Sequence, residues 1–127
     1  ISLAEKNISP AVVGDQIGRL TFTPTLVDAI NHLLTANAAP GIYNVSNEGD
    51  PVSWADVTRT IFIELGRDDL IVTDTTTEEY FSSKPESAPR PLRSTLDLSK
   101  IKATGLELRD WRTDLAEYIK QETGETA

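Results

Sequence analysis

The spacing of apolar side chains predicts three amphipathic helices in this chain of 127 residues. Each apolar stripe follows a helix-capping signal: Thr23 with Pro24 behind it, then Ser53, then Asp110. The first and last stripes repeat at i, i+4, i+7 and i+8, the spacing of a single helix face. The three stripes comprise Leu26, Ile30, Leu33 and Leu34; Trp54, Val57, Ile61 and Leu65; and Trp111, Leu115, Tyr118 and Ile119.

Shorter apolar runs between these helices predict strands at residues 12–13, 42–45 and 70–73. Thr76 and Glu79 form a capping box for a further short helix. Three prolines within residues 82–93 predict a loop. Helical and strand patterns therefore alternate along the chain. We expect one α/β domain over residues 1–121 and a frayed tail over residues 122–127.

Charge is unevenly distributed along the chain. The net charge is −8, yet residues 84–102 carry five basic side chains against two acidic ones. Two guanidinium groups close together can bind phosphate oxygens bidentately, so this segment indicates an anion site. The alternative is that its arginines are solvated in a proline-rich loop. The acidity of the chain as a whole argues against nucleic acid as a partner.

Cysteine is absent, which excludes a disulfide framework and a cysteine-ligated metal. A chain without cysteine suits a cytoplasmic enzyme. His32 is the only histidine, so a histidine metal site is excluded as well. No apolar run approaches the length of a membrane span.

Five segments carry a family resemblance. They are Val-Gly-Asp-Gln-Ile-Gly-Arg-Leu-Thr at 13–21, Gly-Ile-Tyr-Asn-Val-Ser-Asn at 41–47, Thr-Glu-Glu-Tyr at 77–80, Arg-Pro-Leu-Arg-Ser-Thr-Leu-Asp-Leu-Ser-Lys at 90–100, and Asp-Trp-Arg at 110–112. In this order they resemble the C-terminal part of dTDP-4-dehydrorhamnose reductases, members of the extended short-chain dehydrogenase/reductase superfamily. Residues 18–23 look most like the actinobacterial forms. The resemblance implies a parent enzyme that reduces dTDP-4-dehydrorhamnose with NADPH to form dTDP-L-rhamnose.

The glycine-rich turn of such enzymes is not found in this chain. Its glycines never fall in the G-x-G-x-x-G or G-x-x-G-x-x-G arrangement that lets a pyrophosphate approach a helix N-terminus. Residues 1–7 look like the end of a helix. We interpret the chain as the C-terminal substrate-binding part of a Rossmann-type reductase, lacking the N-terminal dinucleotide-binding half. The resemblance then implies that NADPH and the catalytic tyrosine and lysine belong to that half, so that this segment alone is inactive.

Tyr80 and Lys84 match the catalytic pattern Tyr-x-x-x-Lys literally. The chemistry requires both side chains on one helix face. Pro85 disfavours a helical conformation at Lys84, the residue before it. We therefore expect Tyr80 to be structural and no catalytic residue to lie in this chain.

The candidate binding residues lie on two predicted loops. Gln16 and Arg19 lie on the loop between the first strand and the first long helix, and Arg90 and Arg93 lie on the proline-rich loop. Loops held by a packed scaffold commonly carry binding groups. Resemblance to nucleotide-sugar enzymes implies that arginines from both loops converge on the nucleotide diphosphate. We predict phosphate contacts for Arg19 and Arg90, with Arg93 assisting. Hydrogen bonds to the nucleotide or sugar are predicted for three neutral residues, which could instead satisfy local backbone: Gln16, Thr21 and Ser94.

Trp54 and Trp111 each stand directly after a helix cap and begin an apolar stripe. An aromatic face can stack on a sugar, but large aromatic side chains are usually well buried. We expect both tryptophans to anchor the core.

Several assignments stay open. The parent could be a non-catalytic regulatory subunit of the same fold, or a related nucleotide-sugar epimerase or dehydratase. The resemblance also implies a possible homodimer and a role for Mg²⁺, without identifying its ligands. Helices that pack on the missing half would expose apolar faces, which promotes self-association.

Overall fold

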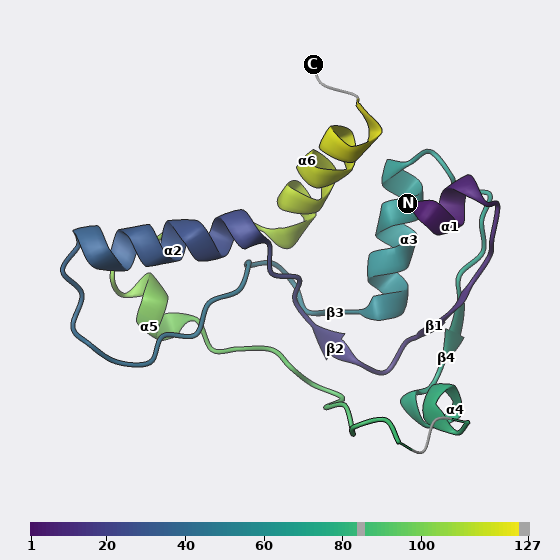
Figure 1. Ribbon diagram of the computed structural model, residues 1–127, viewed down its shortest axis with the longest axis horizontal. Helices are drawn as coiled ribbons and strands as arrows, with labels where there is room; N and C mark the ends of the chain where they lie inside the picture. The colour runs from purple at the N-terminus through teal and green to yellow at the C-terminus, as the bar shows by residue number, and fades with distance from the viewer. Residues whose placement is uncertain (84–85, 125–127) are drawn as a thin grey trace.

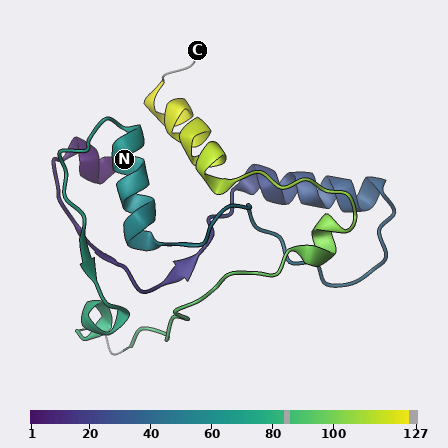
Figure 2. The ribbon, with the colours of Figure 1, turned by 180° about the vertical axis from the view of Figure 1, so that it is seen from behind.

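The computed structural model describes residues 1–83 and 86–124. In chain order its elements are α1 (Ser2–Glu5), β1 (Ala11–Val13), β2 (Ile17–Gly18), α2 (Thr23–Thr35), β3 (Val52–Ser53), α3 (Trp54–Glu64), β4 (Thr73–Thr75), α4 (Thr77–Phe81), α5 (Ser99–Lys102) and α6 (Trp111–Thr123). Figures 1 and 2 show α1, α3, β1 and β4 at one end of the molecule and α2 with α5 at the other. Residues 86–98 run from the end that contains α4 towards α5 (Figures 1 and 2).

The strands are short and form two separate pairs. β1 pairs with β4 in parallel, with Ala11 opposite Thr73 and Val13 opposite Thr75. β2 pairs with β3 antiparallel, with Ile17 opposite Ser53. Because β3 leads directly into α3, the second pair fixes the start of α3 beside residues 16–18.

Two clusters of buried apolar side chains hold these elements together. One contains Ala4, Ala55, Phe62 and Val72, and the other contains Trp111, Leu115 and Ile119. Ile61 and Leu65 of α3 pack against both clusters. Helix α3 therefore connects the two clusters of the core.

A buried polar network connects α6 to the start of α2. Asp114 Oδ2 accepts hydrogen bonds from Asn47 Nδ2 at 2.6 Å and from Thr25 Oγ1 at 3.3 Å. The amide of Phe22 donates to Asn47 Oδ1 at 3.0 Å. All three polar side chains are buried. Asp114 Oδ1 is buried without a hydrogen-bond partner among the described residues, but it lies 3.1 Å from the Arg109 guanidinium. The hydrogen bonds at Oδ2 favour one arrangement, because any slippage would leave Asn47 and Thr25 without their acceptor.

The predicted helix starts are confirmed where the cap is local. Ser53 with Asp56, and Thr76 with Glu79, form complete capping boxes, and Asp110 accepts from the amide of Arg112. The predicted cap at Thr23 is wrong, since Thr23 is itself helical and Phe22 precedes the helix. At the other end, α6 continues through Thr123, so the first two residues of the predicted tail are helical; residues 125–127 lie outside the described part.

The strand predicted at residues 42–45 is wrong. These residues pair with no strand in the described part of the chain, and Ile42 is 85% exposed. The carbonyl of Ile42 accepts from Lys100 Nζ at 2.9 Å, and that ammonium lies 4.3 Å from the centre of the Tyr43 ring. An apolar run has strand character, but a strand also needs a neighbour to bond to. The strand predicted at 70–73 is displaced, because β4 covers Thr73–Thr75.

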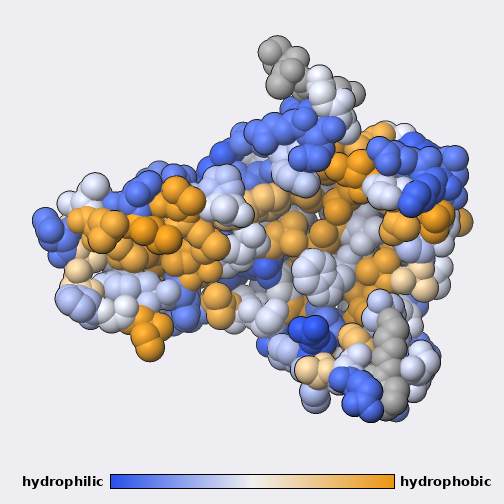
Figure 3. All heavy atoms as spheres, in the orientation of Figure 1, coloured by the Kyte–Doolittle hydropathy of each residue, from blue (hydrophilic) through white to orange (hydrophobic). Residues whose placement is uncertain are grey.

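Helix α2 presents part of its apolar stripe to solvent. Its buried residues are Thr25 and Ala29, whereas four large apolar side chains are exposed: Leu26, Val27, Ile30 and Leu34, here called the α2 face. Figure 3 shows apolar residues gathered over this end of the molecule. Exposed apolar helix faces were expected from the sequence. None of the helices in residues 1–83 and 86–124 is long and apolar enough to cross a membrane.

Candidate functional site

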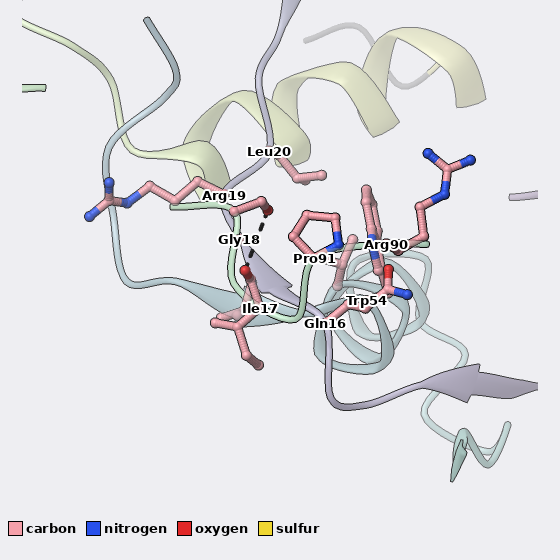
Figure 4. Close-up of a pocket in the computed structure, with 11 residues that line it drawn as sticks. Gln16, Ile17, Gly18, Arg19, Leu20, Trp54, Arg90 and Pro91 are labelled. Atoms are coloured by element: carbon pink, nitrogen blue, oxygen red, sulfur yellow. Dashed lines mark hydrogen bonds between the residues drawn. The ribbon is translucent and has the colours of Figure 1, made fainter. Parts of the chain in front are cut away.

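A cavity of about 280 Å³ opens where three segments meet: residues 16–20, the start of α3, and residues 90–94. Figure 4 shows the side chains that line it. The lining residues are Gln16, Ile17, Gly18, Arg19, Leu20, Val52, Trp54, Val57, Arg90, Pro91 and Ser94. Four of the six predicted binding residues are among them: Gln16, Arg19, Arg90 and Ser94. Thr21 and Arg93 are not.

Backbone hydrogen bonds bring the proline-rich segment to the cavity. The amide of Ile17 donates to the carbonyl of Leu92 at 2.8 Å, and the amide of Ser94 donates to the carbonyl of Ile17 at 2.9 Å. Ser94 Oγ also lies 3.4 Å from that carbonyl, the contact dashed in Figure 4. At Gly18, a Cβ atom would stand 2.5 Å from Ser94 Oγ. A side chain at position 18 would therefore displace the Ser94 hydroxyl from its present position.

Arg19 and Arg90 line the same cavity, but their guanidinium groups point in opposite directions (Figure 4). The Arg19 guanidinium donates to the carbonyls of Gly49 at 2.7 Å and of Leu96 at 3.3 Å. It thereby ties residues 49 and 96 to the cavity wall. The two guanidinium groups do not meet at one point as the sequence predicted, because tertiary carbonyls hold one of them.

The predicted arginines differ from the others in their partners. Arg59, Arg67, Arg109 and Arg112 all pair with carboxylates. Arg19 bonds to neutral carbonyls only, and the exposed side chains of Arg90 and Arg93 have no hydrogen-bond or ion-pair partner among the described residues. These three positive charges therefore lack a carboxylate partner in that part of the chain. An anionic ligand at Arg90 would not have to displace an acidic side chain of residues 1–83 or 86–124.

Gln16 is held at the cavity by the start of α4. Its Nε2 donates to Thr77 Oγ1 at 3.1 Å, and Thr77 Oγ1 donates to Asp15 Oδ1 at 2.6 Å. The amide of Thr77 also donates to the Asp15 carboxylate. These hydrogen bonds from Thr77 lower the pKa of Asp15, because they favour its charged form. One amide oxygen and one N–H of Gln16 stay available for a ligand.

The two tryptophans have different surroundings. Trp111 is fully buried, and its Nε1 donates to the carbonyl of Asp50 at 3.0 Å. Its predicted core role is confirmed. Trp54 is 52% exposed and forms part of the cavity wall, so its predicted core role is wrong. The cap places both residues at a helix start, but neighbours distant in sequence cover only one of them.

The remaining candidates lie elsewhere. Thr21 is exposed and away from the cavity lining. Tyr80 lies in α4 with its ring 5.0 Å from that of Phe81, and Lys84 is outside the described residues. Across residues 1–83 and 86–124, no three His, Asp or Glu side chains gather as a metal site would require.

The starts of helices α3 and α6 do not fit a dinucleotide pyrophosphate. Such a site needs free amides and closely approaching glycine backbone at a helix N-terminus. At α3 the first amides are capped by Ser53, and the carboxylate of Asp56 stands in the same turn. At α6 the corresponding position holds Asp110. Negative side chains at these two helix starts would repel phosphate.

Solved structures that share this fold include dTDP-4-dehydrorhamnose reductases. The structure resembles the crystal structure of a dTDP-4-dehydrorhamnose reductase ortholog from Clostridium acetobutylicum, with a TM-score of 0.84, 30% identity, and coverage of 96% of this chain and 41% of that one. It also resembles the dTDP-4-dehydrorhamnose reductase of Bacillus anthracis in complex with NADP, with a TM-score of 0.79, 28% identity, and coverage of 94% and 40%.

Residues 1–123 match the model of the RmlD substrate binding domain, and the chain belongs to that family. The spore coat polysaccharide biosynthesis protein SpsK of Bacillus subtilis is 38% identical over 121 residues, which are 95% of this chain and 40% of that protein. A dTDP-4-dehydrorhamnose reductase of Streptomyces griseus is 40% identical over 111 residues, 84% of this chain and 35% of that protein. The predicted family and α/β fold class, the C-terminal part of a Rossmann-type reductase, are confirmed. The chain spans about 40% of the length of SpsK.

Proposed function

We propose that these residues form the substrate-binding part of an NADPH-dependent reductase that converts dTDP-4-dehydrorhamnose to dTDP-L-rhamnose. The observation that carries the proposal is the cavity, where Arg90 stands without a carboxylate partner among the described residues. Support comes from the family match and from relatives named dTDP-4-dehydrorhamnose reductase. We place the reaction in the cytoplasm, in keeping with a chain that contains no cysteine.

In this proposal the proline-rich segment binds the diphosphate. Arg90 contacts a phosphate directly, and Arg93 adds positive charge from the same segment. A guanidinium fork matches two phosphate oxygens, which makes it more selective than a lysine. Gln16 and Ser94 bind neutral parts of the ligand. The role of Arg19 is positional, because its guanidinium holds the carbonyls of Gly49 and Leu96. Thr21 is the least favoured contact, since it is outside the lining.

Hydride transfer is assigned to a further part of the same polypeptide. That part would bind NADPH, which supplies the hydride, and would carry the catalytic tyrosine and lysine. The contribution of the present residues is to bind the nucleotide and so hold the keto sugar in register, since remote binding energy orients the reacting centre. We propose that the α2 face packs against this further part. A homodimer and a requirement for Mg²⁺ stay predictions.

The test is an assay of the full-length protein with NADPH and dTDP-4-dehydrorhamnose. We expect NADPH oxidation that depends on the sugar nucleotide, and none from the 127-residue chain alone. A regulatory subunit would bind dTDP-sugars without oxidising NADPH. An epimerase or dehydratase would convert the sugar nucleotide without consuming NADPH. Either result would contradict the proposal.

Replacement of Arg90 tests the phosphate contact. A charge-assisted hydrogen bond contributes about 1.5–3 kcal/mol, so Arg90→Ala should weaken dTDP binding by about 10- to 100-fold. Lys120→Ala is the matched control, because it removes one positive charge from an exposed position on α6 outside the cavity lining. Its dTDP affinity should stay near that of the parent. Equal losses in both variants would mean that Arg90 acts only through net charge.

A further inference from the structure

We propose that the indole of Trp54 stacks on the pyrimidine base of the nucleotide sugar, while Arg90 binds the adjoining phosphate. This inference rests on the proposed function and deepens it, because it assigns the base to a defined wall of the cavity. It also gives a role to a side chain that sequence reasoning placed in the core.

The exposure of Trp54 is the first observation. Its side chain is 52% exposed within the cavity lining. No described residue forms a ring contact or a side-chain hydrogen bond with it. An exposed indole face favours a planar aromatic ligand. Stacking such a ligand on the indole removes apolar area from water and adds a ring–ring interaction.

The size and lining of the cavity decide which part of the ligand enters it. At about 280 Å³ it lies just below the range of sites that enclose a whole drug-sized ligand, so it suits one portion of a nucleotide sugar. Its walls include Leu20, Val52, Val57 and Pro91. Apolar walls disfavour a diphosphate, which would lose its hydration there. A flat base fits between these walls, and the phosphate remains with the exposed guanidinium of Arg90.

Gln16 offers hydrogen bonds to the polar edge of a base, such as that of thymine. Its Nε2 already donates one hydrogen bond to Thr77 Oγ1, which fixes the amide. The free Oε1 and the second N–H then form an acceptor and a donor side by side. The imide edge of thymine offers an adjacent N–H and C=O that can pair with them. Cytosine and adenine also carry an adjacent donor and acceptor, so Gln16 binds the edge of the base without selecting the base.

Equilibrium titrations with the full-length protein test the inference. The probes are dTDP and a dTDP-sugar. For the parent we expect saturable binding of dTDP and of the dTDP-sugar. Trp54→Ala should weaken dTDP binding by about 5- to 100-fold, which is the range for the loss of base stacking on an aromatic ring. Trp54→Phe should retain part of the affinity. In the reductase assay, Trp54→Ala should raise KM for the sugar nucleotide more than it lowers kcat.

Ile63→Ala is the matched control, because Ile63 is an exposed apolar residue of α3 away from the cavity lining. Its affinity should equal that of the parent. Unchanged dTDP affinity in Trp54→Ala would overturn the inference. Loss of affinity for the dTDP-sugar alone would also overturn it, since Trp54 would then contact the sugar. A parent that binds no dTDP and oxidises no NADPH would refute the proposed function, and the inference would fall with it.

Discussion

The surroundings of Trp111 and Trp54 differ although both residues begin a capped helix. Trp111, Leu115 and Ile119 form the α6 cluster, and apolar side chains from residues 20–22, β3 and α3 pack against it. The indole N–H of Trp111 donates to a backbone carbonyl. At Trp54, residues 16–20 and 90–94 do not cover the indole, which lines the cavity between them. Leu20 and Val52 belong to both regions, since they pack against the α6 cluster and also line the cavity. The packing around Trp111 therefore also holds in place two residues of the cavity wall beside Trp54.

This difference teaches that an apolar helical residue has no fixed role until its tertiary neighbours are known. The cost of exposing an indole is large enough that a folded chain normally covers it. We infer that Trp54 stays open because a ligand covers it. The predictions below separate structural from binding roles on this basis.

The largest expected effect is on stability at Trp111. Trp111→Ala should lower the free energy of unfolding by about 3–5 kcal/mol, because it removes a fully buried side chain. Trp54→Ala should change it by less than about 1 kcal/mol, since half of that side chain already faces solvent. Urea denaturation measures both values. Comparable losses in the two variants would erase the distinction drawn here.

A smaller effect is expected in the polar network beneath Trp111. Asp114→Ala leaves Asn47 and Thr25 without their carboxylate acceptor, which should cost about 1–3 kcal/mol. Glu117→Ala is the control, because Glu117 also pairs with Arg109 but is exposed. Its loss should cost at most about 1 kcal/mol. If Glu117→Ala proved the more costly in urea denaturation, the network would not be what holds α6 to α2.

Local signals in the sequence predicted the helix starts well. The capping boxes at Ser53 and Thr76 require only residues within the same turn, so the sequence contains all their partners. The strand at residues 42–45 was predicted wrongly because its surroundings come from distant segments. The direction of the Arg19 guanidinium was not predicted, since the carbonyls of Gly49 and Leu96 hold it. Exposure of Ile42, for example, depends on which strands are present to pair with it. Four of the six candidate residues nevertheless line one cavity, since both loops were recognised as binding loops.

The smallest expected effect is a pH dependence beside the cavity. Hydrogen bonds from Thr77 lower the pKa of Asp15 in the folded chain, so its contribution to stability is complete above the pKa of the unfolded chain. That contribution is lost as the pH falls through the lowered folded value. Thermal midpoints should therefore separate the parent from Asp15→Asn at neutral pH and converge in acid. Asp68→Asn, a change at an exposed aspartate, should follow the parent throughout. A difference between the two thermal midpoints that widened on acidification would contradict the lowered pKa of Asp15.

The most direct measurement of the central claim is the response of the two indole N–H signals to dTDP. Proton–nitrogen correlation spectra of the protein, with the signals assigned through Trp54→Phe and Trp111→Phe, report each ring separately. We predict that dTDP shifts the Trp54 signal in a saturable way and leaves the Trp111 signal nearly unchanged. Saturable binding that leaves the Trp54 signal in place would contradict a nucleotide site at this cavity.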